Sequence, residues 1–283
     1  MSLKAEHIFY TYQKNTPFES EALHDVTVEI EKGSFTGIIG HTGCGKSTLV
    51  QHFNGLLRPE QGQVWVDGQL MTDKNVGELR KKVGLVFQYP EYQLFEETVF
   101  KDVAYGIRKE ALSEEEKRIR VLEALDIVGM EASLAERSVY DLSGGQKRRV
   151  ALAGIIVMNP DYLVLDEPAA GLDPVGRDEI LRYLKRLQTE RGTTIVLVSH
   201  SMEDIARLAD DIYVLNDSRV ALSGTAAEVF QNEDRLNEIG LAVPQITLLW
   251  NRLRNRFPTL PRDVYTVEAA LQAVSDYMGG RVK

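Results

Sequence analysis

The chain has 283 residues, of which 43% are hydrophobic, and its formal net charge is −9 because 42 acidic residues outnumber 33 basic ones. This composition predicts a globular chain with one large domain or two small ones, and the acidic balance argues against a nucleic-acid partner. The single cysteine, Cys44, excludes an intramolecular disulfide. The sequence contains no apolar run of about 18 residues, the length needed to span a bilayer, and no signal-type segment follows Met1. We therefore expect a cytoplasmic protein that needs a partner for any membrane role.

Strand patterns dominate the first part of the chain and return later at intervals. Residues 26–30 and 63–66 alternate apolar and polar side chains, as half-buried antiparallel strands do, and they predict a small N-terminal β-subdomain. Apolar, β-branched runs recur at residues 35–40, 83–87, 162–165, 194–199 and 212–215. Helical patterns separate several of these runs, so we expect an α/β fold with a mostly parallel sheet covered by helices.

A glycine-rich loop with the spacing G-x-x-x-x-G-K-[ST] lies between an apolar run and a helical run. It consists of Gly40, His41, Thr42, Gly43, Cys44, Gly45, Lys46 and Ser47, followed by Thr48. The glycines allow backbone N–H groups to converge on phosphate oxygens at a helix N-terminus. Lys46 would reach the β- and γ-phosphates, and the Ser47 hydroxyl would ligate Mg²⁺. The strand, loop and helix context favours a nucleotide triphosphate site over a plain glycine-rich turn.

Two further residues near this loop are candidates for nucleotide contacts. Tyr12 lies in an N-terminal strand pattern and could stack on adenine, although ordinary packing explains a single aromatic residue equally well. Gln88 follows a core strand and precedes Tyr89 and Pro90, where regular structure ends. Gln88 could contact Mg²⁺ and the attacking water. Alternatively, it could be a turn residue without a role in nucleotide binding.

A helical insertion interrupts the strands over about residues 89–158. Ser113 and Glu116 form a capping box at the start of one helix, and Ser143 opens another. The second start, Ser143, Gly144, Gly145 and Gln146, is itself an anion-binding helix N-terminus. The spacing gives no reason for it to fold back onto the glycine-rich loop of its own chain. Two chains arranged head to tail would instead share two nucleotide sites.

Two core strands end in residues that suit hydrolytic chemistry. The strand over residues 162–165 leads into Asp166 and Glu167, at the edge where α/β sheets place their ligands. Asp166 would hold Mg²⁺ and Glu167 would polarise the attacking water, although an acidic pair can also cap the next helix. The next strand delivers His200 to the same edge, where it could contact the γ-phosphate; as a lone histidine it would more often be structural.

In order and approximate spacing, these motifs resemble those of ATP-binding cassette (ABC) ATPases over about residues 3–225. The matching segments are residues 40–47, Gln88, residues 142–146, residues 165–168, residues 171–173 and His200. The resemblance implies a P-loop NTPase (RecA-like) core, with Glu167 as the catalytic carboxylate and His200 as the switch histidine. It places Asp173 in a loop that communicates across an ATPase dimer. Cys44 and Ala169 depart from the commonest residues at their positions without removing a required group.

A narrower resemblance points to the ATPases of energy-coupling factor (ECF) transporters, which import vitamins and transition-metal ions. It is carried by residues 16–19 before Ala22 and Leu23, by residues 52–59 and 86–95, and by a helical tail. It implies a second ATPase subunit, favouring a heterodimer, with a transmembrane coupling protein that docks near residues 89–95 and a substrate-binding membrane protein. The expected location is the cytoplasmic face of the cell membrane, as a peripheral protein that uses ATP and Mg²⁺.

The resulting domain hypothesis divides the chain into an ATP-binding domain, residues 1–225, and a C-terminal helical dimerisation segment, residues 226–283. In the tail, Thr225, Pro244 and Thr266 are the expected helix starts, and residues 241–244 and 248–250 are the expected apolar contacts of the dimer. Two alternatives remain open. One is the ATPase of a conventional ABC transporter, and the other is a non-transport ABC protein, which would normally carry coiled-coil insertions or a second cassette.

Overall fold

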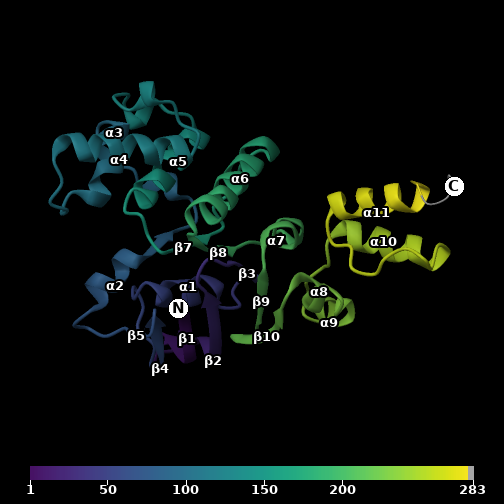
Figure 1. Ribbon diagram of the computed structural model, residues 1–283. Coiled ribbons are helices and arrows are strands. Elements are labelled where there is room, and N and C mark those ends of the chain that lie inside the picture. Colours follow the sequence, from purple (N-terminus) through teal and green to yellow (C-terminus); the bar gives the residue numbers. More distant parts are fainter. Residues whose placement is uncertain (280–283) are drawn as a thin grey trace.

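The computed structural model describes residues 1–279, which fold around a six-stranded sheet with the strand order β10-β9-β3-β8-β7-β6 (Figure 1). The strands are β3 (Phe35–Ile39), β6 (Val83–Val86), β7 (Tyr162–Asp166), β8 (Thr194–Val198), β9 (Asp211–Asn216) and β10 (Arg219–Gly224). All pair in parallel except β10, which returns beside β9. The five predicted core strands are confirmed. β10 was not predicted; it follows a tight turn in which Asp217 and Ser218 both have positive φ.

A second, antiparallel sheet forms the predicted β-subdomain and has the strand order β2-β1-β4-β5. Its strands are β1 (Ser2–Tyr12), β2 (Ser20–Glu31), β4 (Gln61–Val66) and β5 (Gln69–Leu70). One helix of the core, α1 (Lys46–Phe53), contacts strands of both sheets. Helix α1 therefore packs against both sheets.

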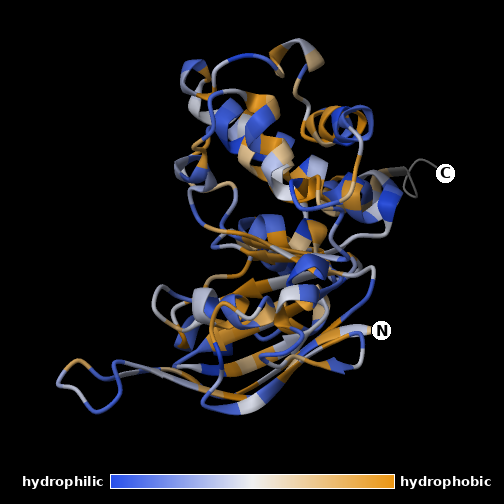
Figure 2. Cartoon of the chain, turned by 90° about the vertical axis from the view of Figure 1, so that its left-hand side faces the viewer, coloured by the Kyte–Doolittle hydropathy of each residue, from blue (hydrophilic) through white to orange (hydrophobic). Residues whose placement is uncertain are grey.

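The parallel strands are buried on both faces, which explains their continuous apolar runs. Side chains alternate between the two faces of a strand. Tyr162 and Val164 of β7 accordingly pack in the cluster shared with α1 and the antiparallel sheet. Leu163 and Leu165 pack in the opposite cluster, which includes residues of the large helices. Figure 2 shows apolar residues concentrated along these strands.

Helices cover the sheet and form the insertion predicted between β6 and β7. The helices around the core are α2 (Val76–Lys82), α6 (Pro174–Arg191) and α7 (Met202–Leu208), and those of the insertion are α3 (Val99–Ala104), α4 (Glu114–Ile127) and α5 (Gly144–Ile156). In Figure 1 the insertion stands above the sheets and away from the N-terminal β-subdomain. Ser113 forms the expected capping box at the start of α4.

Helix α5 begins in the segment predicted to open it, and its first helical residue is Gly144. Ser143 is the N-cap: its hydroxyl accepts from the Gln146 N–H over 3.3 Å, and the Gln146 side chain accepts from the Ser143 N–H over 3.0 Å. This reciprocal capping box makes Gly144 and Gly145 the first helical residues.

The C-terminal helices are α8 (Ala226–Phe230), α9 (Glu233–Glu238), α10 (Gln245–Arg256) and α11 (Val267–Gly279), and the last two form a hairpin away from the sheets (Figure 1). Trp250 is buried within this hairpin, and its Nε1 donates to the Pro261 carbonyl over 2.9 Å. Leu241 and Val243 are also buried in the chain. The expectation that these apolar residues contact another subunit is therefore wrong for Trp250, Leu241 and Val243, because they already pack inside this one.

Within residues 1–279, none of the helices combines the length and the apolar character needed to cross a membrane.

Candidate active site

The glycine-rich loop joins β3 to α1 and closes around the Lys46 ammonium group. Lys46 is buried, and its Nζ donates to the carbonyl oxygens of Gly40 and His41, each over 2.8 Å. Gly45 has φ of 102°, and a Cβ atom there would lie 2.3 Å from the Ala22 carbonyl oxygen. Only glycine fits that contact and that conformation. The loop is thus held in one shape with a cation beneath it, as a phosphate site requires.

The remaining loop residues divide into an exposed tip and a buried base. Thr42 and Gly43 are exposed at the tip, whereas Cys44 is only 1% exposed and its Sγ lies 3.8 Å from Lys46 Nζ. Burial raises the pKa of the Cys44 thiol, and the nearby Lys46 charge offsets this only in part. His41 contacts the Asn216 Oδ1 atom through Nε2 at 3.0 Å. His41 therefore ties the loop to the end of β9.

Tyr12 lies beside the start of α1. Its hydroxyl is 3.3 Å from the Thr48 Oγ1 atom, and its ring stacks edge-on against Tyr10. The side chain remains partly exposed next to the glycine-rich loop. The position suits the predicted contact with adenine, which stays a prediction.

Ser47 and Asp166 provide a set of oxygen atoms that suits Mg²⁺. Ser47 is exposed at the start of α1, and its hydroxyl is near enough to Asp166, at the end of β7, to act on that carboxyl group. Asp166 is 7% exposed, and burial raises the pKa of its carboxyl group although Ser47 and Lys46 act in the opposite direction. A hydroxyl and a carboxylate next to the phosphate loop match the hard oxygen ligands that Mg²⁺ prefers. The residues present therefore fit the ion.

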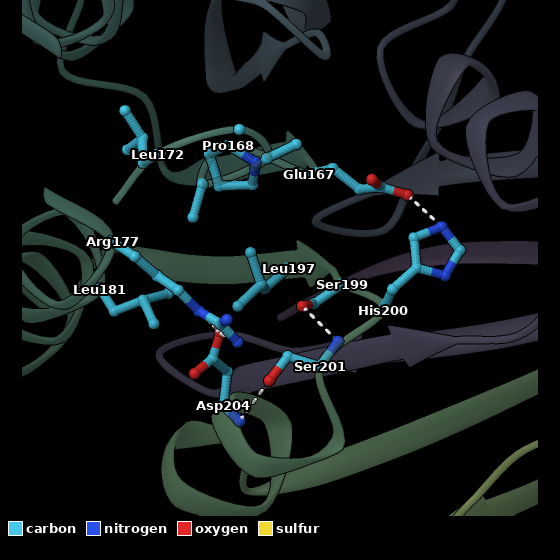
Figure 3. Close-up of a pocket in the computed structure, with 13 residues that line it drawn as sticks. Glu167, Pro168, Leu172, Arg177, Leu181, Leu197, Ser199, His200, Ser201 and Asp204 are labelled. Carbon is cyan, nitrogen blue, oxygen red and sulfur yellow. Dashed lines mark hydrogen bonds and ion pairs between the residues drawn. The ribbon is translucent and has the colours of Figure 1, made fainter. Parts of the chain in front are cut away.

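Glu167 lies between Gln88 and His200. The Gln88 amide donates to Glu167 Oε2 over 3.3 Å. On the other side, His200 Nε2 lies 2.5 Å from Glu167 Oε1 (Figure 3). These residues follow β6, β7 and β8, which are neighbours in the sheet. The structure thus brings the three predicted catalytic residues together at the carboxyl edge of the sheet, where α/β proteins bind their ligands.

Polar contacts stabilise the loop that carries His200 and the start of the helix that follows it. Ser199 Oγ accepts from the Ser201 N–H over 3.0 Å, and Arg177 donates twice to the Asp204 carboxylate over 2.6 and 2.8 Å. These residues line a cavity of about 210 Å³ together with Glu167. Figure 3 shows Arg177 and Asp204 across this cavity from Glu167. Sequence reasoning missed Arg177, because an arginine in the first turn of a helix carries no distinctive signal by itself.

The segment from Ser143 to Gln146 lies in the insertion, and its side-chain hydrogen bonds are those of its own capping box. Ser143 is exposed, and a Cβ atom added at Gly144 or Gly145 would meet nothing within 4 Å. Asp173 is also exposed and caps α6 by accepting from the Gly176 N–H over 2.9 Å. The structure therefore brings Gln88, Glu167 and His200 together at the sheet edge. The segment that begins at Ser143 and the residue Asp173 remain exposed on the surface.

Comparisons with known proteins agree with this geometry. A family model described as ABC transporter matches residues 23–170. The energy-coupling factor transporter ATP-binding protein EcfA2 of Clostridium acetobutylicum is 53% identical over 97% of both chains, and that of Caldanaerobacter subterraneus subsp. tengcongensis is 52% identical over 99% of both. The chain belongs to the ATP-binding proteins of ECF transporters. Its similarity to these ECF proteins extends over nearly the whole chain, including the helical tail.

Solved structures of related cassettes have the same fold. The protein cbiO1 of Clostridium perfringens, part of the ABC transporter complex cbiONQ, has a TM-score of 0.75 and 39% identity over 88% of this chain and 98% of its own. A dimeric ATP-binding cassette in a post-hydrolysis state, bound to ADP and Pi, has a TM-score of 0.72 and 31% identity over 79% of this chain and 98% of its own. The chain is thus an ABC-type ATPase with the predicted P-loop NTPase fold, and the ECF type is favoured over the two alternatives.

Proposed function

We propose that this chain is one of two ATPase subunits that drive solute uptake through an ECF transporter at the cytoplasmic face of the membrane. The observation that carries the proposal is the placement of Glu167 between Gln88 and His200, at the sheet edge that also presents Lys46. Vitamins or transition-metal ions are the expected solutes, from the resemblance to ECF systems. Recognition of the solute is assigned to a membrane subunit.

The hydrolytic step follows from the contacts of these side chains. The glycine-rich loop and Lys46 hold the β- and γ-phosphates of ATP, and Glu167 polarises the attacking water. Gln88 and His200 keep the carboxylate oriented from two sides and can themselves contact the water or the γ-phosphate. Bound at Ser47 and Asp166, with Gln88 nearby, Mg²⁺ would neutralise charge on the phosphates.

The second nucleotide-binding segment requires a second chain. Ser143 and Gly144 are exposed and Gly145 is partly exposed at a helix N-terminus, which attracts anions. In a head-to-tail dimer this segment would face the glycine-rich loop of the other subunit, so that ATP joins the two chains and hydrolysis releases them. A heterodimer with a related ATPase is favoured over a homodimer.

The segment after Gln88 suits contact with a transmembrane coupling protein. Tyr92 and Phe95 are exposed, and Phe95 lines a cavity of about 590 Å³ between this segment and α5. A membrane protein that binds here would contact the same segment that carries Gln88. Movement driven by ATP could then be passed to the membrane subunit.

The C-terminal hairpin is proposed as a further contact between ATPase subunits, through its exposed apolar face. This face includes Leu248, Leu249, Leu271, Val274 and Met278. Leu271→Glu should leave the folded chain intact and weaken the ATPase pair. Size-exclusion chromatography with light scattering checks this, and an unchanged pair would remove the hairpin from the interface.

Copurification from the native membrane tests the proposal as a whole. The tagged chain would be extracted under mild detergent, and its partners identified by mass spectrometry. We expect a second cassette ATPase, a transmembrane coupling protein and a small substrate-binding membrane protein. Recovery of soluble partners alone would contradict the transport function.

A further inference from the structure

One arginine of the helical insertion reaches two loops of the catalytic core. Arg148 lies in α5 and is only 4% exposed. Its Nε and Nη2 atoms donate to the Glu91 carboxylate over 2.9 and 2.5 Å. Its Nη1 atom donates to the carbonyl oxygens of Pro168 and Ala170 over 3.3 and 2.5 Å. A single guanidinium group therefore joins three segments that are distant in the sequence.

The two carbonyl groups belong to the turn that directly follows the catalytic carboxylate. Glu167 has φ of 52°, in the left-handed region, and its carbonyl accepts from the Ala170 N–H over 3.1 Å. A non-glycine residue keeps such a conformation only where its surroundings enforce it. The hydrogen bonds from Arg148 to Pro168 and Ala170 are part of that enforcement.

The carboxylate partner belongs to the other loop that contacts Glu167. Glu91 lies in a short 3₁₀ helix, Pro90–Gln93, which follows Gln88 and Tyr89. Gln88 in turn donates to the Glu167 side chain over 3.3 Å. Arg148 is thus connected to both the backbone and a side-chain partner of Glu167.

The ion pair between Arg148 and Glu91 is largely shielded from solvent. The side chains of Arg148 and Glu91 are 5% and 16% exposed. Burial alone would raise the pKa of Glu91, but the hydrogen bonds of Arg148, a backbone hydrogen bond and the charge of Arg148 together hold that pKa below its ordinary value. Glu91 is therefore ionised at neutral pH. A planar guanidinium can serve a carboxylate and two carbonyls together, which a lysine ammonium group cannot do in the same geometry.

We propose that Arg148 is a positioning residue that links the exposed Ser143 end of α5 to the geometry of Glu167. The inference rests on the proposed dimer, in which Ser143 contacts nucleotide held by the other subunit. Ser143 and Arg148 lie on one short helix, about 8 Å apart along its axis at 1.5 Å per residue. A shift of α5 on contact with nucleotide would move the guanidinium, and with it both loops that set the position of Glu167.

The Arg148→Lys variant tests this link. The assay uses the chain in its assembly with the subunits that copurify with it. Lysine keeps the charge but loses the combined contact with Glu91 and the two carbonyls. We expect kcat for ATP hydrolysis to fall at least tenfold, with KM for ATP within about threefold of the original, because Lys46 and the phosphate loop are untouched. In a Glu167→Gln background, ATP-dependent pairing of the ATPase subunits should persist.

Arg120→Lys is the matched control. Arg120 also joins a carboxylate, Glu110, to a carbonyl, that of Val157, but it does so within the helical insertion. Its kcat should stay within about twofold of the original. Equal turnover of the Arg148→Lys and Arg120→Lys variants would overturn the proposal, as would a loss of turnover that only follows the loss of folded protein.

Glu91→Gln decides the question if Arg148→Lys does not fold. The amide keeps the shape of the side chain and removes its charge, and we expect the same fall in kcat with little change in KM. Unchanged kcat in this variant would refute the link. Failure of the proposed function itself is distinguishable, because the unmodified assembly would then show no ATP turnover or no second ATPase subunit.

Discussion

His200 lies directly against Glu167, with 2.5 Å between the imidazole Nε2 atom and carboxylate Oε1. The other carboxylate oxygen accepts from Gln88 over 3.3 Å. The Glu167 side chain is 17% exposed and that of His200 is 45% exposed, so the pair lies at an opening rather than in the core. A carboxylate held from two sides at such an opening is placed to orient a water molecule against a phosphate.

Replacing Glu167 with glutamine should separate nucleotide binding from hydrolysis. The amide keeps the shape of the side chain but cannot polarise water as a base does, so turnover should fall about 10²–10⁴-fold. Binding of a fluorescent ATP analogue should be retained, because Lys46 and its loop are unchanged. Glu190→Gln, at an exposed carboxylate on α6, is the control and should hydrolyse ATP normally. Near-normal hydrolysis by Glu167→Gln would contradict the catalytic assignment.

Replacing His200 with alanine should lower turnover by about 10²-fold, because Glu167 then keeps only its contact with Gln88. The thermal midpoint should change little, since the His200 side chain is 45% exposed. Steady-state hydrolysis and differential scanning fluorimetry measure the two effects. His7→Ala removes an exposed histidine that pairs with Asp25, and it should leave turnover unchanged. If His200→Ala hydrolysed ATP as fast as His7→Ala, His200 would have no role in the hydrolytic step.

Two glycine substitutions should differ sharply in their effect on the free energy of unfolding. Gly45→Ala places a Cβ atom 2.3 Å from the Ala22 carbonyl oxygen at a positive φ, and should reduce stability by about 1–3 kcal/mol and abolish ATP binding. Gly144→Ala meets no atom within 4 Å in the first turn of α5, and should leave the unfolding free energy within about 1 kcal/mol.

The same Gly144 variant also tests the open surface at the start of α5. If that surface contacts nucleotide in a second subunit, turnover should fall although the isolated chain is stable. Chemical denaturation and ATPase assays on one preparation provide both measurements. Full turnover would mean that the surface needs no close contact there.

Cys44 should resist alkylation near neutral pH. Burial raises its pKa, so the folded chain holds less of the reactive thiolate than the unfolded chain at any pH below that pKa. Labelling by iodoacetamide should be slow at pH 7, accelerate as pH rises beyond the ordinary range for cysteine, and be slowed further by ATP. Mass spectrometry follows the rate, and denaturant should restore the speed of a free thiol. Rapid labelling of the folded chain at pH 7 would contradict the buried position.

Much of the candidate site could be predicted from the sequence alone, because each of its motifs consists of residues that are close together in the chain. The spacing of Gly40, Gly45 and Lys46 defines a phosphate loop without any distant contact. Glu167 and His200 each follow a buried apolar run, and parallel strands end at one edge of a sheet, so their proximity could be predicted. The capping box at Ser113 and the helix start at Thr225 were likewise predictable from neighbouring residues.

Tertiary structure decided which groups meet across long separations. Nothing in the sequence pairs Arg148 with Glu91 and the turn after Glu167, because that contact depends on how the insertion packs on the core. Nor did the apolar pattern of the tail reveal that Trp250 faces its own hairpin while Leu249 faces outward. Local motifs follow from the chemistry of neighbouring residues, whereas burial and long-range pairing depend on the packing of whole elements, which no single segment encodes.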